Sequence, residues 1–199
     1  MSTAIDTPSS PYSGARPGGR SARVRSAVLG AALDLLGESG YDALSLPAVA
    51  RRAGVHPTTI YRRWCSKQGL LADAMLAYAE QHLPTPDTGS LRGDIEQSIR
   101  DVIDVLSQKP VRELLSALAA DAALAAERAR FWSERASRAA PIIERAVARG
   151  ELQVGLDPHD LMESVAAAVY LRALVTGREL DEAFIQRHAE RIVAAYAPS

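Results

Sequence analysis

The chain is 199 residues long, 47% hydrophobic and 24% charged, with a formal net charge of −1 and a single cysteine. It contains no run of eighteen apolar residues and no apolar stretch at its N-terminus, so we expect neither a membrane span nor a secretory signal. Cys65 has no second cysteine to pair with, which excludes an internal disulfide and agrees with a cytoplasmic protein. Abundant Ala and Leu and only 5% aromatic residues predict an all-α fold.

Residues 1–19 are rich in Ser, Pro and Gly and predict a disordered arm. Arg16 and the arginines that follow it make this arm basic, and basic arms can reach into a neighbouring minor groove. A solvated tail without a role is at least as good an interpretation for residues 1–15.

Residues 20–82 predict a three-helix domain that ends in a longer helix. The first helix, from about Ser21 to Glu38, places small and aliphatic residues on one face, and Gly40 stops it. Ser66 is placed to cap the longer helix. The apolar side of this helix consists of Leu70, Leu71, Ala74, Met75 and Tyr78.

The stretch SLPAVARRAGVHPTTIYRRW, from Ser45 to Trp64, predicts a helix-turn-helix, whose second helix enters the DNA major groove. Ser45 can cap the first helix, and Gly54 stands where a turn needs a residue that takes positive φ at no steric cost. Ile60 and Trp64, four residues apart, hold the second helix to the core. The residues that we expect to face DNA are Pro57, Thr58, Thr59, Tyr61, Arg62 and Arg63.

The charge distribution favours the same interpretation. From Arg16 to Leu70 nine basic residues stand against three acidic ones, a net charge of +6, whereas the rest of the chain carries −7. Such a basic segment on a nearly neutral protein is typical of a surface that meets phosphate. Two helices around a glycine are also common in all-α proteins that bind no nucleic acid, but the local charge disfavours that alternative.

The first positions of the second helix should reach base edges. The ring of Pro57 and the methyl groups of Thr58 and Thr59 suit contact with a thymine methyl. Arg62 and Arg63 can read guanine or hold phosphate, and we expect one of each without a basis for choosing between them. The helix N-terminus at Ser45 favours phosphate as well. Arg51 and Arg52, on the first helix, are expected to touch only DNA backbone or solvent.

His56 precedes the second helix, where a small hydroxyl residue caps better. We therefore expect Thr58 or Thr59 to hold the turn. His56 remains a candidate for a phosphate contact with a charge that titrates near neutrality. A solvated turn residue is an equally good interpretation.

Several short stretches resemble the TetR family of bacterial transcriptional regulators. The resemblance is specific over about Ser21 to Ala79, and Tyr170 to Arg178 resembles the C-terminal ends of one branch of the family. The stretches that carry it are Gly40–Tyr41, Ser45, Val49–Val55, Thr59–Arg62 and Ser66–Leu71.

The resemblance implies a homodimeric regulator, usually a repressor, that leaves a double-stranded, palindromic operator when a small molecule binds its C-terminal domain. It also implies that Thr59 and Tyr61 contact phosphate and backbone. By the same resemblance, Lys67 contacts phosphate from the start of the next helix. The departure at His56 puts the cap of the recognition helix in doubt.

Residues 83–90 predict a hinge, because Pro84 and Pro86 cannot continue the preceding helix. Residues 91–199 predict a larger helical domain for ligand binding and dimerisation. The first helices expected there run from Leu91 to Ser107, from Pro110 onward, and from Ala125 to Arg149 with a kink or break at Pro141. Asp157 should cap a helix that begins at Pro158 and ends at about Thr176, and Asp181 should cap the last helix.

A ligand pocket should lie between helices of this domain. Its candidates are Phe131, Trp132, Met162 and Tyr170, with Arg172 as a partner for an anion, although plain core packing is the alternative for each. These residues favour a mostly apolar ligand, and an aromatic or weakly acidic compound would suit them. The candidates for the dimer interface are Val165, Val169, Phe184, Ile185, His188 and Ile192.

No catalytic motif is present, and the four histidines are too far apart in sequence to indicate a metal site, so we expect neither an enzyme nor a cofactor. Two other classes of function remain. One is an architectural DNA-binding protein without an effector. The other is a helical module that binds a small molecule or protein and retains the helix-turn-helix as a scaffold. Activation rather than repression is also open.

Overall fold

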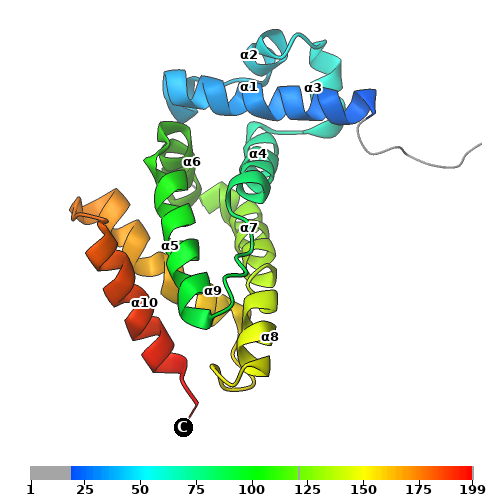
Figure 1. Ribbon diagram of the computed structural model, residues 1–199. Coiled ribbons are helices and arrows are strands. Elements are labelled where there is room, and N and C mark those ends of the chain that lie inside the picture. Colours follow the sequence, from blue (N-terminus) through cyan, green and yellow to red (C-terminus); the bar gives the residue numbers. More distant parts are fainter. Residues whose placement is uncertain (1–18, 121, 199) are drawn as a thin grey trace, which may run out of the picture.

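The computed structural model describes residues 19–120 and 122–198, and every regular element in these ranges is helical, as the composition predicts. Figure 1 shows an elongated bundle with the first helix laid across one end. The elements are α1 (Arg20–Ala43), α2 (Leu46–Arg52), α3 (Pro57–Arg63), α4 (Lys67–His82), α5 (Leu91–Ser107), α6 (Lys109–Ala120), η1 (Ala122–Leu124), α7 (Ala125–Ser137), α8 (Ala140–Ala148), α9 (Pro158–Leu171), η2 (Arg172–Thr176) and α10 (Glu182–Tyr196). Nearly all of the predicted N-terminal arm lies outside the described residues.

The first four helices share one core. Val28 on α1, Val49 on α2 and Ile60 on α3 are completely buried, as their spacing in the sequence predicts. Gly40 interrupts the helical geometry near the end of α1 with φ 78° and ψ 174°, a conformation that a residue without Cβ adopts at no steric cost. The core therefore fixes the short helices α2 and α3 to one side of α1 (Figure 1).

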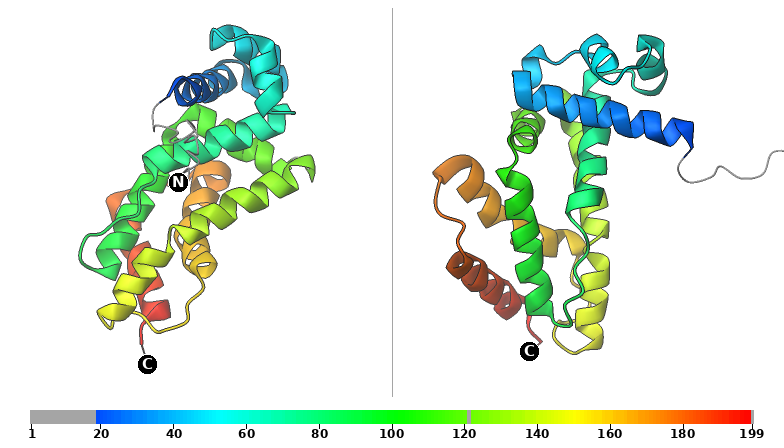
Figure 2. Two further views of the ribbon diagram at one scale, coloured as in Figure 1. Left: turned by 90° about the vertical axis from the view of Figure 1, so that its right-hand side faces the viewer. Right: turned by 45° about the horizontal axis from the view of Figure 1, so that its top comes forward.

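The N-terminal helix also packs directly on the larger domain. α1 lies across α6 as well as α4, and Figures 1 and 2 show the end of α6 beneath α1. At this crossing a Cβ atom on Gly37 would lie only 2.7 Å from Cγ of Pro110. A side chain at position 37 would push the two helices apart, so the close crossing needs glycine.

Residues 83–90 contain no helix, as the two prolines predict, but the larger domain holds this segment in place. Nη1 of Arg135 on α7 donates to the carbonyl oxygen of Leu83 at 3.1 Å. Arg145 on α8 donates to the carbonyl oxygen of Pro86, which is itself buried. The predicted hinge is thus an anchored connection in this state of the protein.

A buried carboxylate completes the anchor. Asp94, near the start of α5, is 0% exposed and accepts hydrogen bonds from the backbone N–H (2.6 Å) and the hydroxyl (2.7 Å) of Thr88. Arg145 on α8 and Arg149, which directly follows α8, place Nη2 atoms 3.7 and 3.9 Å from Oδ2 of Asp94. Asp94 therefore joins the connecting segment, α5 and α8, a role that the sequence did not indicate.

The kink or break predicted at Pro141 is a complete break. α7 ends at Ser137 and α8 begins at Ala140, so that Pro141 stands in the first turn of a new helix, where its missing N–H costs no hydrogen bond. The two helices then follow each other down one edge of the bundle (Figure 1).

The last two helices begin at the predicted caps. Carboxylate oxygens of Asp157 and Asp181 accept backbone N–H groups two and three residues further along. α9 runs to Leu171 and continues as the π-helical turn η2, which ends at Gly177 with φ 64°. The end predicted near Thr176 therefore coincides with the end of that turn.

The predicted dimer interface requires a correction, because most of its residues belong to the core of a single chain. The structure buries five of them to 8% exposure or less: Val165, Val169, Phe184, Ile185 and Ile192. His188 is half-buried and stacks on the ring of Phe184, with 5.3 Å between centroids. The apolar stripe of α10 packs on α5 and α9 of the same chain.

Candidate DNA-binding surface and ligand cavity

The turn between α2 and α3 has the predicted geometry. Oγ of Ser45 accepts the backbone N–H of Ala48 at 3.4 Å, so Ser45 caps α2. Gly54 takes φ 64°, which reverses the chain before α3. Ile60 is completely buried and Trp64 is 4% exposed, so these two side chains hold α3 on the core as the sequence predicts.

His56 itself caps the recognition helix, contrary to the expectation that Thr58 or Thr59 would do so. Nδ1 of His56 accepts the backbone N–H of Thr58 at 3.4 Å and lies 2.9 Å from the hydroxyl of the same residue. An imidazole can replace the hydroxyl of a usual cap because its unprotonated nitrogen is also an acceptor.

The opposite face of α3 is open to solvent. Tyr61 is 50% exposed, and Thr59 is half-buried at the edge of the helix. Arg63 lies over the ring of Trp64, with 5.4 Å from its guanidinium carbon to the centroid. The other exposed residues of this face are His56, Pro57, Thr58 and Arg62. The side chains predicted to face DNA therefore share one surface, with Thr59 at its margin.

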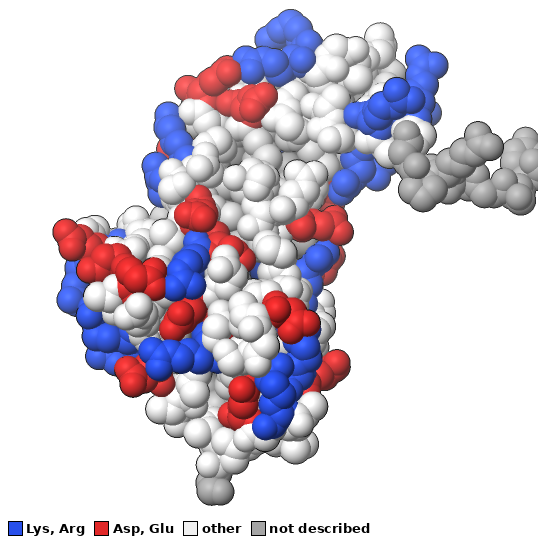
Figure 3. Space-filling model, viewed as in Figure 1, with Lys and Arg blue, Asp and Glu red and all other residues white. Residues whose placement is uncertain are grey.

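An open groove between α1 and α3 adds two arginines to this surface. Arg20 and Arg25 from α1 line it together with Arg62 and Arg63 from α3, and none of the described residues that line it carries a carboxylate. Figure 3 shows Lys and Arg side chains at this end of the N-terminal domain. The groove offers a concentration of positive charge beside the recognition helix, which suits a phosphate backbone.

Lys67 and Arg52 already have partners within the chain. Nζ of Lys67 donates to the carbonyl oxygen of Tyr41 at 2.9 Å and lies 4.0 Å from the centroid of its ring. Arg52 forms two hydrogen bonds with Glu38, at 2.8 and 2.6 Å, where the sequence predicted only DNA backbone or solvent. The ammonium of Lys67 has further hydrogens to donate, so its contact with phosphate stays a prediction.

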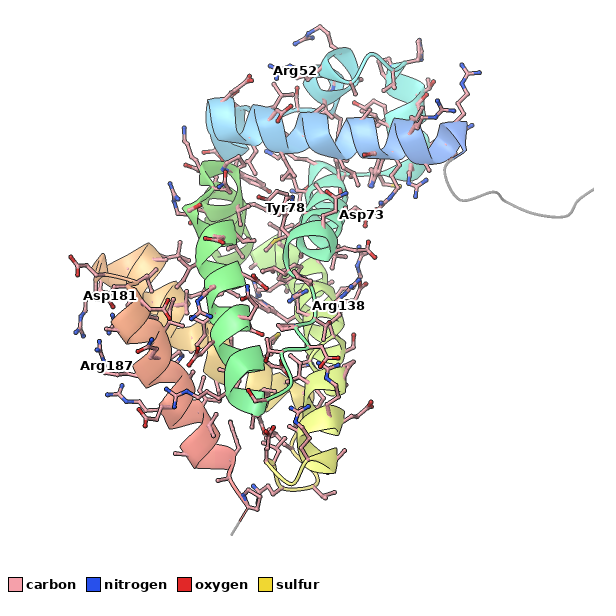
Figure 4. The ribbon with its side chains drawn as sticks, viewed as in Figure 1. Arg52, Asp73, Tyr78, Arg138, Asp181 and Arg187 are labelled. Carbon is pink, nitrogen blue, oxygen red and sulfur yellow. The ribbon has the colours of Figure 1, made fainter. Side chains whose placement is uncertain are left out.

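The end of the recognition helix is connected to the larger domain through α4. Nε1 of Trp64, which follows α3, donates to Oδ2 of Asp73 on α4 at 3.0 Å. Oδ1 of Asp73 accepts from Arg130 on α7, and Arg25 on α1 is 4.0 Å from Oδ2. Figure 4 shows Asp73 at the junction of the two domains. One carboxylate thus contacts three other elements.

A cavity of about 70 Å³ lies inside the larger domain. Four of the five predicted pocket residues line it: Phe131, Trp132, Met162 and Tyr170. Arg172 does not, because its guanidinium lies 4.0 Å above the ring of Phe184 and donates to the carbonyl oxygen of Glu179 at 2.6 Å. The prediction of Arg172 as the anion partner in the pocket is therefore wrong.

The cavity wall contains charged residues that the sequence did not reveal. Asp101 on α5 and Arg135 and Arg138 on α7 line it with the aromatic residues. Burial raises the pKa of Asp101, and burial lowers the pKa of Arg135, which the charge of Arg138 lowers further. Burial also raises the pKa of Tyr170 to about 12. The wall is apolar with a few polar groups, as ligand sites usually are.

Known proteins match both domains. Residues 28–74 match the family described as bacterial regulatory proteins of the tetR family, and residues 85–192 match the family described as the tetracyclin repressor-like C-terminal domain. The chain belongs to the TetR family.

Named relatives agree with this assignment. The chain is 34% identical over 164 residues to the HTH-type transcriptional regulator YdeS of Bacillus subtilis, covering 80% of this chain and 83% of that protein. It is 35% identical over 172 residues to the DNA-binding transcriptional repressor TetR of Mycobacteroides abscessus, covering 84% and 90%. The solved structure of the TetR family regulator SCO0332 is 31% identical, with a TM-score of 0.72, and covers 88% of this chain and 100% of that one.

This TetR-family protein is a DNA-binding transcriptional regulator of the helix-turn-helix type, as the sequence predicts. Its named relatives are regulators and not enzymes. Within residues 19–120 and 122–198 no group of His, Cys, Asp and Glu side chains is arranged to hold a metal ion. No helix in the same ranges is long and apolar enough to cross a membrane.

Some residues of this TetR-family chain were missed because only the fold brings them together. Asp73 is nine residues from Trp64 and 57 from Arg130, and no local pattern connects the three. Asp101 gave a weak signal, since it comes four residues before the buried Val105 and so borders the apolar face of its helix.

Proposed function

We propose that this protein is a homodimeric repressor that a small molecule releases from its operator. The observation that carries the proposal is the mostly apolar cavity, whose wall includes residues of α7, the helix that also binds α4. Arg130 on α7 binds Asp73 on α4, and α4 follows the recognition helix directly. A ligand that moves α7 therefore acts on the element that supports α3.

The DNA-facing residues have separate roles in this proposal. Pro57, Thr58 and one of Arg62 and Arg63 contact bases, while His56 and the other arginine meet phosphate. The remaining contacts to phosphate and backbone come from Ser45, Thr59, Tyr61 and Lys67. The groove between α1 and α3 supports this division, because it brings further arginines close to the phosphates on one side of α3.

A second copy of the chain binds, in our proposal, to apolar side chains that the fold leaves exposed near the end of α9. Leu171 is 53% exposed, Leu174 39% and Val175 74%. Exposed apolar groups of this size gathered in one place are typical of interaction sites. Ala167, an exposed small residue on α9 shortly before them, permits close helix contact.

Ligand release follows from the geometry of a dimer. Two recognition helices must lie roughly 34–36 Å apart, or a multiple of this, to meet two half-sites. A ligand shifts the population only by its difference in affinity between the two spacings, typically about 1–3 kcal/mol. The anchored segment 83–90 transmits the movement, because α7 and α8 hold its carbonyl groups.

The proposal is tested by selecting bound duplexes from random DNA with the purified protein at about 0.15 M salt, since affinity has no meaning without the salt concentration. We expect a palindromic or nearly palindromic motif. Tyr61→Ala removes an exposed side chain without disturbing the core and should weaken binding to every duplex, because Tyr61 contacts phosphate and backbone in this proposal. Weak binding to any duplex without an enriched motif would instead favour an architectural protein.

Dimerisation is tested separately by sedimentation. We expect Leu174→Glu to convert a dimer into a monomer, because a charge replaces an exposed apolar side chain. Val154→Glu is the matched control, since Val154 is 84% exposed in a loop far along the chain from this patch. A dimer that survives Leu174→Glu would place the interface elsewhere.

A further inference from the structure

The cavity of the larger domain has an aromatic wall of defined geometry. Trp132 is edge-on to Phe131 and to Tyr170, with 4.9 and 5.8 Å between ring centroids. Ile95 and Leu161, both almost completely buried, add aliphatic surface. Surfaces of this kind favour a flat, ring-containing compound over a flexible chain.

Asp101 brings an acceptor without a partner to this wall. Nε2 of Gln97 donates to Oδ1 of Asp101 at 2.7 Å. Oδ2 is buried and receives no hydrogen bond from any of the described residues. A buried acceptor without a partner is energetically unfavourable. A ligand that donates a hydrogen bond to Oδ2 of Asp101 removes this cost and therefore binds more tightly.

Arg135 and Tyr170 bring donors to the same wall. Arg135 uses Nη1 to bind the carbonyl oxygen of Leu83, and its guanidinium carries further N–H groups. The hydroxyl of Tyr170 is protonated at neutral pH, and burial raises its pKa further, to about 12. A ligand group in this part of the cavity therefore meets an acceptor and donors together.

The wall carries charges of both signs. An ionic ligand that pairs with one of them also meets a like charge, because Asp101 lies in the same wall as Arg135 and Arg138. A hydroxyl group carries no charge and both donates and accepts. We infer that the cavity binds an uncharged aromatic compound with a phenolic or enolic hydroxyl, whose O–H donates to Asp101 and whose oxygen accepts from Arg135. The inference rests on the proposed ligand-binding function and adds the chemical class of the ligand.

The test uses four naphthalene probes that differ in one substituent, with the full-length protein and no DNA. Calorimetry measures the binding of 2-naphthol, 2-methoxynaphthalene, 2-naphthoate and 2-naphthylmethylamine. We expect 2-naphthol to bind at least about tenfold more tightly than its methyl ether, because the ether has no hydrogen to donate. The carboxylate and the amine should both bind more weakly than the naphthol.

Asp101→Asn tests the residue itself. The amide replaces one carboxylate oxygen by an NH₂ group. This group can donate to the oxygen of either the naphthol or its ether, so the preference for naphthol should fall to about twofold or less. Asp104→Asn removes the same charge from the exposed side of the same helix and should keep the wild-type preference. Melting curves of both variants confirm that they fold.

Four results would overturn the inference. These are equal binding of naphthol and its ether to the wild type, tightest binding of the carboxylate or the amine, an unchanged preference in Asp101→Asn, and no binding of any probe. The selection of duplexes from random DNA is independent of these measurements. Failure of the ligand class therefore leaves DNA recognition intact, and failure of DNA recognition leaves the probe results meaningful.

Discussion

Arg130 on α7 and Asp73 on α4 join the two domains of the chain, with 2.5 Å between Nη2 and Oδ1. The other oxygen of the same carboxylate accepts the indole N–H of Trp64, the residue that ends the recognition helix. Arg130 directly precedes Phe131, which lines the ligand cavity. Two hydrogen bonds to the side chain of Asp73 therefore connect the helix that lines the cavity to the end of the DNA-binding helix.

Asp73 should make the stability of the fold depend on pH. Burial alone raises the pKa of Asp73, but hydrogen bonds from Arg130 and Trp64, together with nearby positive charge, hold it below its ordinary value of 3.8. A carboxyl whose pKa is lower in the folded state stabilises the fold above the unfolded-state pKa, and this contribution is lost as the pH falls through the folded-state pKa. We expect Asp73→Asn to be less stable than wild type at pH 7.

The difference in unfolding free energy between wild type and Asp73→Asn should shrink below about pH 4, where the unfolded carboxyl is protonated. Urea denaturation at pH 7 and pH 2.5 measures it. Asp104→Asn, on an exposed surface, is the control and should show little difference at either pH. An equal difference for Asp73→Asn at both pH values would contradict the assignment.

Arg130→Met should reduce communication between ligand and DNA more than it reduces stability. The ion pair is half exposed on the arginine side, so its removal should cost no more than about 1 kcal/mol. We expect the operator affinity of the free protein to change less than about threefold, while the loss of affinity caused by ligand falls from the usual range of about 5–150-fold towards unity.

Fluorescence anisotropy with a labelled operator, with and without ligand, measures both quantities. Arg92→Met is the matched control, because Arg92 makes an exposed ion pair with Glu96 inside one helix and connects no two elements. If ligand releases the Arg130→Met variant from DNA as readily as it releases the wild type, the effect of ligand reaches α3 through other contacts, such as the crossing of α1 and α6.

The sequence was sufficient for features that depend on local chemistry. Ser45, Ser66, Asp157 and Asp181 cap helices as predicted, because a cap needs only a side-chain oxygen and the next few backbone N–H groups. The interruption of α1 at Gly40 followed from the conformational freedom of that residue. These are properties of neighbours in sequence.

The sequence was insufficient where the position of a residue depends on which helices pack against each other. The apolar stripe of α10 was recognised correctly, but Phe184 and Ile192 pack inside their own chain, since a stripe does not say what covers it. Arg172 was predicted in the pocket, yet it stacks on Phe184 from the π-helical turn. Asp94 and Asp101 were overlooked because burial of a carboxylate depends on contacts with distant helices.

Gly37→Ala should destabilise the protein at the crossing of α1 and α6. Its Cβ would lie 2.7 Å from Cγ of Pro110, a rigid ring, and overpacking of this kind costs about 1–3 kcal/mol. Gly30→Ala on the same helix has no atom within 4 Å of the new Cβ, and should stabilise by about 0.5–1 kcal/mol. The melting temperature should therefore fall for Gly37→Ala and rise for Gly30→Ala. A shift of the same sign in both variants would contradict the packing argument.

Asp94→Ala should be among the most destabilising substitutions in the larger domain. It leaves the backbone N–H of Thr88 without its acceptor and removes the negative charge close to Arg145 and Arg149, which should cost about 3–5 kcal/mol. Urea unfolding measures the loss. Asp104→Ala, an exposed carboxylate on the same helix, should change stability by no more than about 0.5 kcal/mol. A mild effect of Asp94→Ala would mean that the anchored segment is held mainly by the arginine contacts.

Lys67→Met separates a structural role of this lysine from a role in binding phosphate. Lys67 donates to Tyr41 and covers its ring, so the variant should lose about 1 kcal/mol of stability whether or not the lysine touches DNA. If the ammonium also neutralises a phosphate, the slope of log affinity against log salt should become shallower by about 0.9 per half-site. We expect both changes. Arg52→Met, which breaks the pair between Arg52 on α2 and Glu38 on α1, is the control and should leave the slope unchanged. A lower stability with an unaltered slope would assign Lys67 to the junction of α1 and α4 alone.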